Sequence, residues 1–282
     1  MIRIGSRGSR LALAQASWVA ERIEGETEIV TITTAGDLGA DEQDKSRWVS
    51  ELERALLDDR VDVAVHSAKD VPAEPASGLE LVAIPERADP RDAICGARSL
   101  TDLAEGARVG TSSPRRAAQL RALRQDLEIV PVRGNVDTRL RKLGEGGLDA
   151  LVLAAAGLTR LGREPDGILD ELVPAAGQGA LALEAQPGGI NQRALVALHD
   201  EAAAACVSVE RALTAALGAS CNTPVGAHAR WEGGELELSA WVGRPDGSAW
   251  VADRLRGAPD GLGQRCAQRL LAAGADELLR AA

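Results

Sequence analysis

The chain has 282 residues, 45% hydrophobic content and a formal net charge of -10 at pH 7. It is long enough for two or three domains, and its charge excludes the basic footprint that nucleic-acid binding requires. No apolar run reaches the roughly 18 residues that span a bilayer, the first residues lack the apolar core of a signal peptide, and the cysteines show no metal-ligand spacing. We therefore expect a cytoplasmic protein without a metal, membrane or nucleic-acid partner.

The first third of the chain alternates predicted strands with predicted helices. A strand at 2–5 precedes a helix over about 11–23, with Ser9 as the N-cap. The helix start, with Arg3 and Arg7 beside it, offers N–H groups and positive charge to a carboxylate or a phosphate. Further strands are expected at 29–33, 61–65 and 79–84, a helix at 48–56, and a polar candidate lid at 33–46.

The predicted strand at 61–65 ends in polar residues. His66, Ser67, Lys69 and Asp70 follow it, and Pro72 prevents a strand or a helix from continuing. In open α/β sheets, ligands bind at the carboxyl ends of strands. These residues alone leave two interpretations open, namely solvated charges at a strand end or a functional site.

The second third repeats this plan after a charged, proline-containing connection at 85–92. Strands are expected near 109, at 129–132 and at 151–153, each followed by a helix. Ser113 is expected as an N-cap, with Pro114 in the favoured first helical position. The repetition indicates a second lobe built like the first.

Arginines accumulate after these strands and in the helices that follow. The positions are Arg115, Arg116, Arg133, Arg139 and Arg160. Parallel strands would gather them at one edge of a sheet, where guanidinium groups bind carboxylates well. The pattern favours a polycarboxylate or polyphosphate ligand between two lobes over scattered surface arginines.

The last third changes from a helical to an alternating pattern. A turn and strand at 174–184 is expected to return the chain to the first lobe, before a helical run at 194–217. Strands at 235–242 and 250–255 form a hairpin, and a helix over 262–279 completes an α+β domain. Cys221 lies in a loop of small residues, either as a nucleophile or as an incidental thiol.

Together these motifs resemble the porphobilinogen deaminase family, nearly from end to end. The segments are RIGSRGSRLALAQ at 3–15, VHSAKDVP at 65–72, DPRD at 89–92, GTSSPRR at 110–116, RGNVDTRL at 133–140, AGLTRLG at 156–162, GQGA at 177–180, and Cys221 with PVG at 224–226. Their order and spacing are specific together, although no single segment would suffice.

The resemblance implies an α/β fold with two lobes like those of type II periplasmic binding proteins, closing over a central cleft, and a smaller C-terminal α+β domain. By this pattern the first lobe comprises 1–86 with 180–197, and the second lobe comprises 87–179. The C-terminal domain, 198–282, would carry the cofactor cysteine loop. A monomer is expected.

The resemblance also implies a transferase of tetrapyrrole and heme biosynthesis, hydroxymethylbilane synthase. A dipyrromethane cofactor would be bound through a thioether to Cys221. Four porphobilinogen molecules would be joined head to tail on it with release of ammonia, and hydrolysis would free hydroxymethylbilane. The alternative is a non-catalytic polyanion-binding protein of the same fold, against which the presence of Lys69, Asp70 and Cys221 together counts.

Residue roles follow from the matched positions. Asp70 is the expected catalytic residue, as proton donor and as the carboxylate that stabilises the electron-poor azafulvene through its pyrrole N–H. The expected cofactor-binding residues are Cys221, Lys69, Arg115, Arg116, Arg139, Ser113, Asp37 and Gln178. The expected substrate-binding residues are Arg7, Ser9, Arg3, Gln15, Arg133, Arg160 and Lys45. His66 is expected to be a structural hydrogen-bonding residue.

The sequence departs from the family pattern after Thr33. The family carries a longer lid there, with an arginine before its Gly-Asp pair, whereas here Ala35 precedes Gly36 and Asp37. QDKSRW at 43–48 replaces a glycine-lysine-glycine run that ends in phenylalanine, although Lys45 and Trp48 still align. The contact between Asp37 and the cofactor and the closure of the lid therefore stay open.

Overall fold

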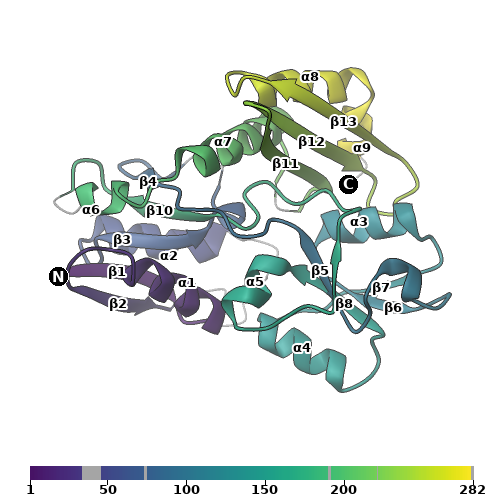
Figure 1. The fold of residues 1–282 in the computed structure, drawn as a ribbon, viewed down its shortest axis with the longest axis horizontal. Coiled ribbons are helices and arrows are strands. Elements are labelled where there is room, and N and C mark those ends of the chain that lie inside the picture. The colour runs from purple at the N-terminus through teal and green to yellow at the C-terminus, as the bar shows by residue number, and fades with distance from the viewer. Residues whose placement is uncertain (34–45, 73–74, 190–191, 221, 281–282) are drawn as a thin grey trace. The chain divides into compact units, whose positions relative to one another are not determined.

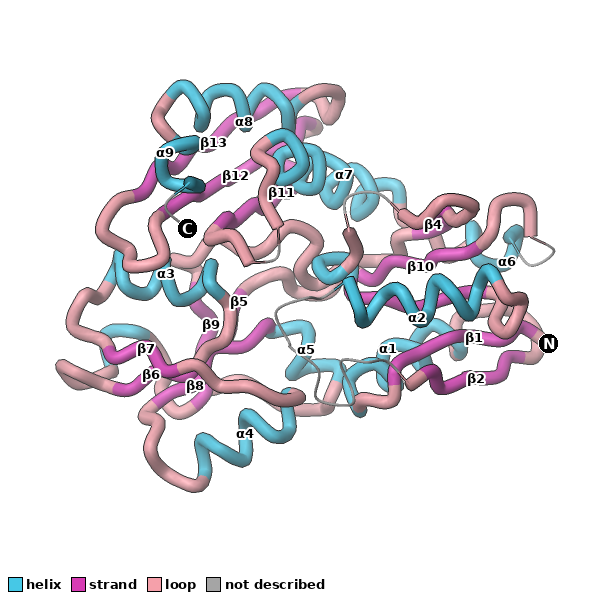
Figure 2. The backbone as a smooth tube through the Cα atoms, turned by 180° about the vertical axis from the view of Figure 1, so that it is seen from behind, coloured by secondary structure: helices cyan, strands magenta, loops and turns pink. Residues whose placement is uncertain are grey.

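The computed structural model describes residues 1–33, 46–72, 75–189, 192–220 and 222–280, with the side chains of 46–48 left out. The chain divides into two compact units, which are Met1–Ala88 with Ala180–Ala205, and Asp89–Gly179 with Cys206–Ala282. Figures 1 and 2 show the elements of both units.

The first unit is a five-stranded mixed sheet with the strand order β2-β1-β3-β10-β4. Its strands are β1 (Ile2–Arg7), β2 (Thr27–Ile32), β3 (Val63–Ser67), β4 (Glu80–Ala83) and β10 (Leu181–Ala185). β1 pairs parallel with β2 and β3, whereas β10 runs antiparallel to β3 and β4. The chain thus returns to the first sheet after residue 180, as the sequence predicted.

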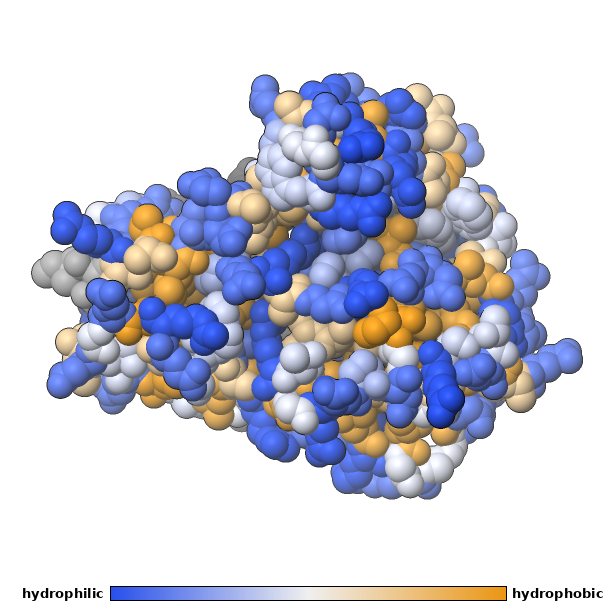
Figure 3. Space-filling view, in the orientation of Figure 1, coloured by the Kyte–Doolittle hydropathy of each residue, from blue (hydrophilic) through white to orange (hydrophobic). Residues whose placement is uncertain are grey.

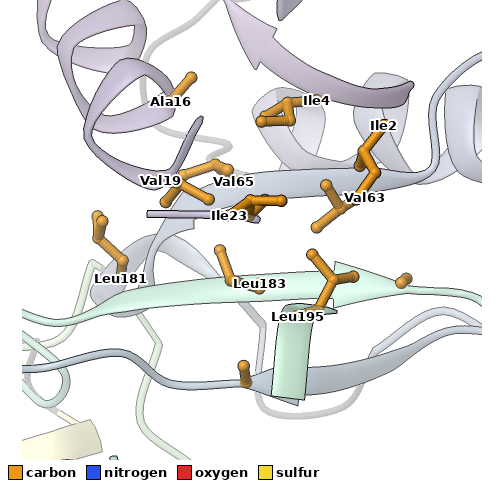
Figure 4. Close-up of a cluster of buried hydrophobic side chains, with 12 residues drawn as sticks. Ile2, Ile4, Ala16, Val19, Ile23, Val63, Val65, Leu181, Leu183 and Leu195 are labelled. Carbon is orange, nitrogen blue, oxygen red and sulfur yellow. The ribbon is translucent and has the colours of Figure 1, made fainter. Parts of the chain in front are cut away.

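Helices cover both faces of this sheet. α1 (Arg10–Ala20) and α2 (Ser46–Leu57) pack on opposite faces, and α6 (Gln192–Val196) lies against β4. On the α1 face, Val63, Val65, Leu181 and Leu183 belong to one apolar cluster, shown in Figure 4. On the α2 face, Ala64 packs with the buried residues of that helix. The alternation along β3 therefore sends successive side chains to two separate cores.

The second unit contains another five-stranded mixed sheet, of order β7-β6-β8-β5-β9. Its strands are β5 (Asp92–Cys95), β6 (Arg108–Gly110), β7 (Glu128–Val130), β8 (Ala150–Ala154) and β9 (Gly167–Leu169). The helices that accompany it are α3 (Pro114–Leu123), α4 (Val136–Gly144) and α5 (Ala155–Arg160). Only β6 pairs parallel with β7 and β8, whereas β5 runs antiparallel to β8 and β9.

The same unit also holds the C-terminal part of the chain. The larger part of α7 (Glu201–Ala216) belongs to it and precedes an antiparallel sheet of order β11-β12-β13, followed by two helices. The elements are β11 (Val225–Glu232), β12 (Glu235–Gly243), β13 (Trp250–Gly257), α8 (Leu262–Ala272) and α9 (Ala275–Arg280). The predicted fold class, two α/β lobes with a smaller α+β part, is confirmed.

Some local predictions were wrong. The run at 194–217 is two helices, because Asp200 caps α7 by accepting the Ala203 N–H at 2.8 Å, and its own N–H donates to Ile84 O at 2.8 Å. The helix predicted at 262–279 is likewise divided, at Gly274, where φ is +96°. The strands β5, β9 and β11 were not predicted, and both large sheets are mixed rather than parallel.

The unit boundaries can be compared with the predicted domain boundaries. The units change at 88/89 and 179/180, close to the predicted 86/87 and at the predicted 179/180. The last change falls at 205/206, inside α7, rather than at 197/198. The second lobe and the C-terminal part form one unit by this division, so the predicted three-domain boundaries stay a prediction.

The surface is mainly polar on the face drawn in Figure 3, where apolar residues form separate areas. Few large apolar side chains are exposed among the described residues, namely Met1, Leu57, Leu123, Val196, Trp231, Trp250 and Leu271. None of the described helices has the length and apolar character needed to cross a membrane.

Candidate functional site

Lys69 and Asp70 lie in one short turn directly after a central strand of the first unit. β3 ends at Ser67, and a single 3-10 turn, Ala68–Asp70, follows. The N–H of Ala68 donates to Ala180 O at 3.0 Å, which joins the turn to the start of β10. Lys69 and Asp70 are both partly exposed. The turn therefore presents one acidic and one basic side chain from a short backbone segment that is hydrogen-bonded to the sheet.

Three more predicted site residues, Arg7, Ser9 and Gln15, belong to the end of β1 and to the start and body of α1 in the same unit. Ser9 is the N-cap of α1, as predicted, and its Oγ accepts the N–H of Ala12 at 3.2 Å. Gln15, which is buried, donates from Nε2 to Ser67 Oγ at 2.8 Å. Arg7 is the last residue of β1, at the start of the loop to α1. The first unit thus brings Gln15 into contact with the last residue of β3, directly before the turn that carries Asp70.

Arg3 belongs to the same strand as Arg7, four residues earlier. It is near the amino end of β1, where its guanidinium donates from Nη2 to Asp62 Oδ1 at 2.8 Å and from Nε to Asp62 Oδ2 at 3.2 Å. These bonds hold the pKa of Asp62 below its usual range. The substrate-binding role of Arg3 therefore stays a prediction.

A buried charged cluster lies at the start of α3 in the second unit. Asp92, the first residue of β5, accepts from Arg115 Nη1 at 2.6 Å and from Arg116 Nε at 2.7 Å. Arg115 and Arg116 are only 3% and 5% exposed, and Asp92 is 0% exposed. Although burial alone would raise it, the two guanidinium charges hold the pKa of Asp92 well below its usual range.

Gln178 completes this cluster. Its Oε1 accepts from Arg116 Nη2 at 3.1 Å, and its Nε2 donates to Asp92 Oδ1 at 2.9 Å. Arg115 Nη1 also donates to Val173 O at 2.8 Å, while its Nε is buried without a hydrogen-bond partner in the described part of the chain. The cluster therefore has two guanidinium groups, one carboxylate and an unused donor.

The other predicted second-lobe residues differ in their environment and in their relation to this cluster. Ser113 is the N-cap of α3, accepting the Arg116 N–H at 3.4 Å. Arg139 is near enough that its charge helps to lower the pKa of Arg116, after the larger effect of burial. Arg160 donates to Gly179 O at 2.8 Å, and burial lowers its pKa to about 10. Arg133 is exposed.

Three predicted residues, Asp37, Lys45 and Cys221, lie outside the described residues. The strand that comes after the cysteine, β11, is described. It begins at Val225, and the N–H of Ala227 donates to Pro174 O at 2.8 Å. A Cβ on Gly226 would come 2.7 Å from Val173 O, the carbonyl that Arg115 contacts. The start of β11 therefore packs beside the buried cluster.

Two residues that make these contacts, Asp92 and Glu210, were not predicted as site residues from the sequence. Asp92 was noted only as part of a motif, although a carboxylate that opens an otherwise apolar four-residue strand suggests a buried ion pair. Glu210 of α7 is fully buried, and it accepts the N–H of Gly177 and of Ala229 at 2.7 Å each. It joins the loop that carries Gln178 to β11.

Comparison with known proteins covers nearly the whole chain. The family model described as porphobilinogen deaminase, dipyromethane cofactor binding domain, matches residues 2–191, and the one described as porphobilinogen deaminase, C-terminal domain, matches 204–272. A porphobilinogen deaminase from Deinococcus deserti is 45% identical, with 100% of this chain and 98% of the relative covered. One from Thiobacillus denitrificans is 46% identical, with 99% and 98% covered.

Solved structures that match include a periplasmic substrate-binding protein of an ABC transporter from Coxiella burnetii, at 16% identity and a TM-score of 0.44, covering 75% of this chain and 97% of that chain. The family models and the full-length relatives decide the matter, and the chain belongs to the porphobilinogen deaminase family.

Proposed function

We propose that Asp70 is the catalytic acid of this enzyme and that cations of the second unit bind carboxylates of the cofactor and the substrate. The activity itself is the synthesis of hydroxymethylbilane from four porphobilinogen molecules with release of ammonia, in tetrapyrrole biosynthesis. The full-length match favours this enzyme over the polyanion-binding alternative. The observation that carries the assignment of roles is the excess of positive charge around Asp92.

The residues present fit a dipyrromethane cofactor, whose pyrroles bear acetate and propionate groups. The buried cluster has two guanidinium groups for one carboxylate, and Arg115 Nε is a buried donor without a hydrogen-bond partner among the described residues. Arg160 is desolvated beside a neutral carbonyl. Buried cations in excess of carboxylates favour an anionic ligand, because an unpaired buried charge is costly.

We assign the cofactor-binding role to Lys69, Ser113, Arg115, Arg116, Arg139 and Gln178, with Cys221 as the attachment point and Asp37 as a further contact. Once attached to Cys221, the dipyrromethane supplies the pyrrole end to which the first substrate unit is joined. Arg116 and Gln178 are already ordered by Asp92, so their donors are held in place before a carboxylate arrives. Preorganised donors bind charge without a reorganisation cost.

Asp70 acts on the substrate. Protonated, its carboxyl group donates a proton to the aminomethyl nitrogen as the carbon–nitrogen bond breaks, so that the electron pair and the proton leave with ammonia. The carboxylate that remains accepts a hydrogen bond from the pyrrole N–H and stabilises the positive charge left on the substrate. The short turn after β3 suits this role because it fixes the Asp70 backbone close to the sheet.

The remaining cations and polar groups serve the substrate and the growing chain. We assign this role to Arg7, Ser9, Gln15, Lys45, Arg133 and Arg160. Every added pyrrole brings two more carboxylates, so positive charge is needed along the whole path of the chain. We further propose a cytoplasmic monomer, which light scattering of the purified holoenzyme would test; a dimer mass at micromolar concentration would contradict it.

Intact-mass measurement tests the cofactor assignment. Expressed in a host that makes porphobilinogen, the protein should carry an adduct of two pyrrole units, and Cys221→Ser should lack it. Cys95→Ser and Cys266→Ser are matched controls, since both thiols are buried and should leave the adduct in place. An adduct that survives Cys221→Ser would overturn the attachment point.

Turnover of Asp70 variants tests the acid. Asp70→Asn keeps the shape of the side chain but cannot donate a proton, so hydroxymethylbilane formation should fall by about a hundredfold or more while the adduct on Cys221 remains. Asp70→Glu, which keeps the acid on a longer stem, should retain more activity than the amide. Equal turnover in Asp70→Asn and the parent enzyme would remove Asp70 from the mechanism.

A further inference from the structure

A buried pair joins β3 and β10 beside the Asp70 turn. His66 Nε2 lies 3.0 Å from Glu184 Oε2, and their side chains are 4% and 0% exposed. In the antiparallel register, His66 lies opposite Ala182, and Glu184 lies opposite Ala64. The pair is therefore diagonal across neighbouring strands, on one face of the sheet.

This is the face that α2 covers. Ala64 packs there with Leu52 of α2, and Glu53 of the same helix lies close to the pair. Burial raises the pKa of Glu53, and the charge of Glu184 raises it further. Glu184 Oε1 is buried without a hydrogen-bond partner among the residues that the structure describes. The Glu184 carboxylate is thus buried near the carboxylate of Glu53, with one of its oxygens lacking a hydrogen bond among the described residues. Its burial costs folding free energy that two apolar side chains in place of the pair would not cost.

The pair lies directly next to the turn that carries Asp70. His66 precedes the last residue of β3, and the turn with Asp70 follows directly. Ala68 N donates to Ala180 O at 3.0 Å, so β10 holds the turn through the main chain while the pair holds the strand below it. A one-residue slip of β10 would move Glu184 to the opposite face, into the apolar cluster that contains Val63 and Val65 of β3 in Figure 4.

We propose that His66 and Glu184 are positioning residues, whose pair fixes the register of β10 against β3 and thereby the direction in which the turn presents Asp70. The inference rests on the proposed role of Asp70. It assigns the pair no contact with the substrate. Misplacement of an acid by about 1 Å can cost up to a hundredfold in rate, so a small register or backbone change would be measurable.

An apolar replacement of the whole pair separates positioning from stability. In the double variant His66→Leu with Glu184→Leu, thermal stability should be unchanged or higher, because replacing both partners of a buried polar pair by apolar side chains is often neutral or stabilising. The Cys221 adduct should remain and KM should change little, while kcat falls by about tenfold to a hundredfold. Glu184→Gln, whose amide oxygen can still accept from His66, should stay within about threefold of the parent kcat.

The matched control is Asp62→Asn, at the amino end of β3, where the Arg3 contact weakens but the Asp70 turn is untouched. Its kcat should equal that of the parent. A folded double variant with the parent kcat would overturn the proposal. If the double variant does not fold, Glu184→Met replaces it, and a kcat equal to that of Glu184→Gln would have the same force.

Asp70→Asn, measured in parallel, distinguishes a failure of the proposed role of Asp70 from a failure of the positioning role of His66 and Glu184. If Asp70→Asn keeps the parent turnover, the proposed role of Asp70 fails, and the positioning role fails with it. If Asp70→Asn loses turnover while the double variant keeps its kcat, only the positioning role fails.

Discussion

Arg115 and Asp92 form a buried ion pair, with Nη1 of the arginine 2.6 Å from Oδ2 of the aspartate. The same carboxylate also accepts from Arg116 Nε at 2.7 Å. One carboxylate therefore orders two guanidinium groups that we assign to the cofactor, and its loss would leave both cations buried without it.

Asp92→Asn should lower the free energy of unfolding by about 3–5 kcal/mol, because an amide cannot balance the buried guanidinium charges. Urea denaturation of the holoenzyme measures this loss. Asp89→Asn is the matched control, since Asp89 pairs with Arg91 near the surface and such pairs contribute about 0–1 kcal/mol. Equal losses in the two variants would show that the cluster does not depend on its buried carboxylate.

Arg160→Met should make the protein more stable and less active. Burial lowers the pKa of Arg160 to about 10, and the bond to Gly179 O is to a neutral acceptor. Replacing a desolvated cation by an apolar side chain of similar length should therefore raise the melting temperature, by the equivalent of about 1 kcal/mol. KM for porphobilinogen should rise or kcat should fall. A variant that is both less stable and fully active would contradict the assigned role.

The Arg3–Asp62 contact predicts a pH dependence of stability. Hydrogen bonds from Arg3 lower the pKa of Asp62 in the folded state, so the contact stabilises the protein above the unfolded pKa of about 3.9 and is lost as pH falls through the lower folded pKa. The difference in unfolding free energy between the parent and Asp62→Asn should be constant from about pH 7 to 5 and shrink below about pH 4. A difference that grows on acidification would contradict this sign.

Local features were predictable from the sequence because they depend on neighbours along the chain. Ser9 and Ser113 were correctly predicted as N-caps, from a small polar residue before a helical pattern. The hairpin of β12 and β13 was equally clear from its alternation and its turn residues.

Contacts between distant residues were not predictable in this way. Asp92 and Arg115 are 23 positions apart, and His66 and Glu184 are 118 apart, so nothing local relates them. The contact between Arg3 and Asp62 was hidden in the same way, because the two residues are 59 positions apart. The family resemblance supplied the site residues, whereas the partners that hold them came from the fold.

Gly226→Ala should weaken both stability and cofactor attachment. A Cβ there would come 2.7 Å from Val173 O, so β11 and residue 173 would have to separate, and overpacking of this kind costs about 1–3 kcal/mol. Because Arg115 donates to the same carbonyl and Cys221 lies just before β11, the fraction of protein with the dipyrromethane adduct should fall as well. Urea denaturation and intact mass measure the two effects. Gly144→Ala, with open space around its Cβ, should change neither, and a fully loaded, equally stable Gly226→Ala would show that this close approach is not needed.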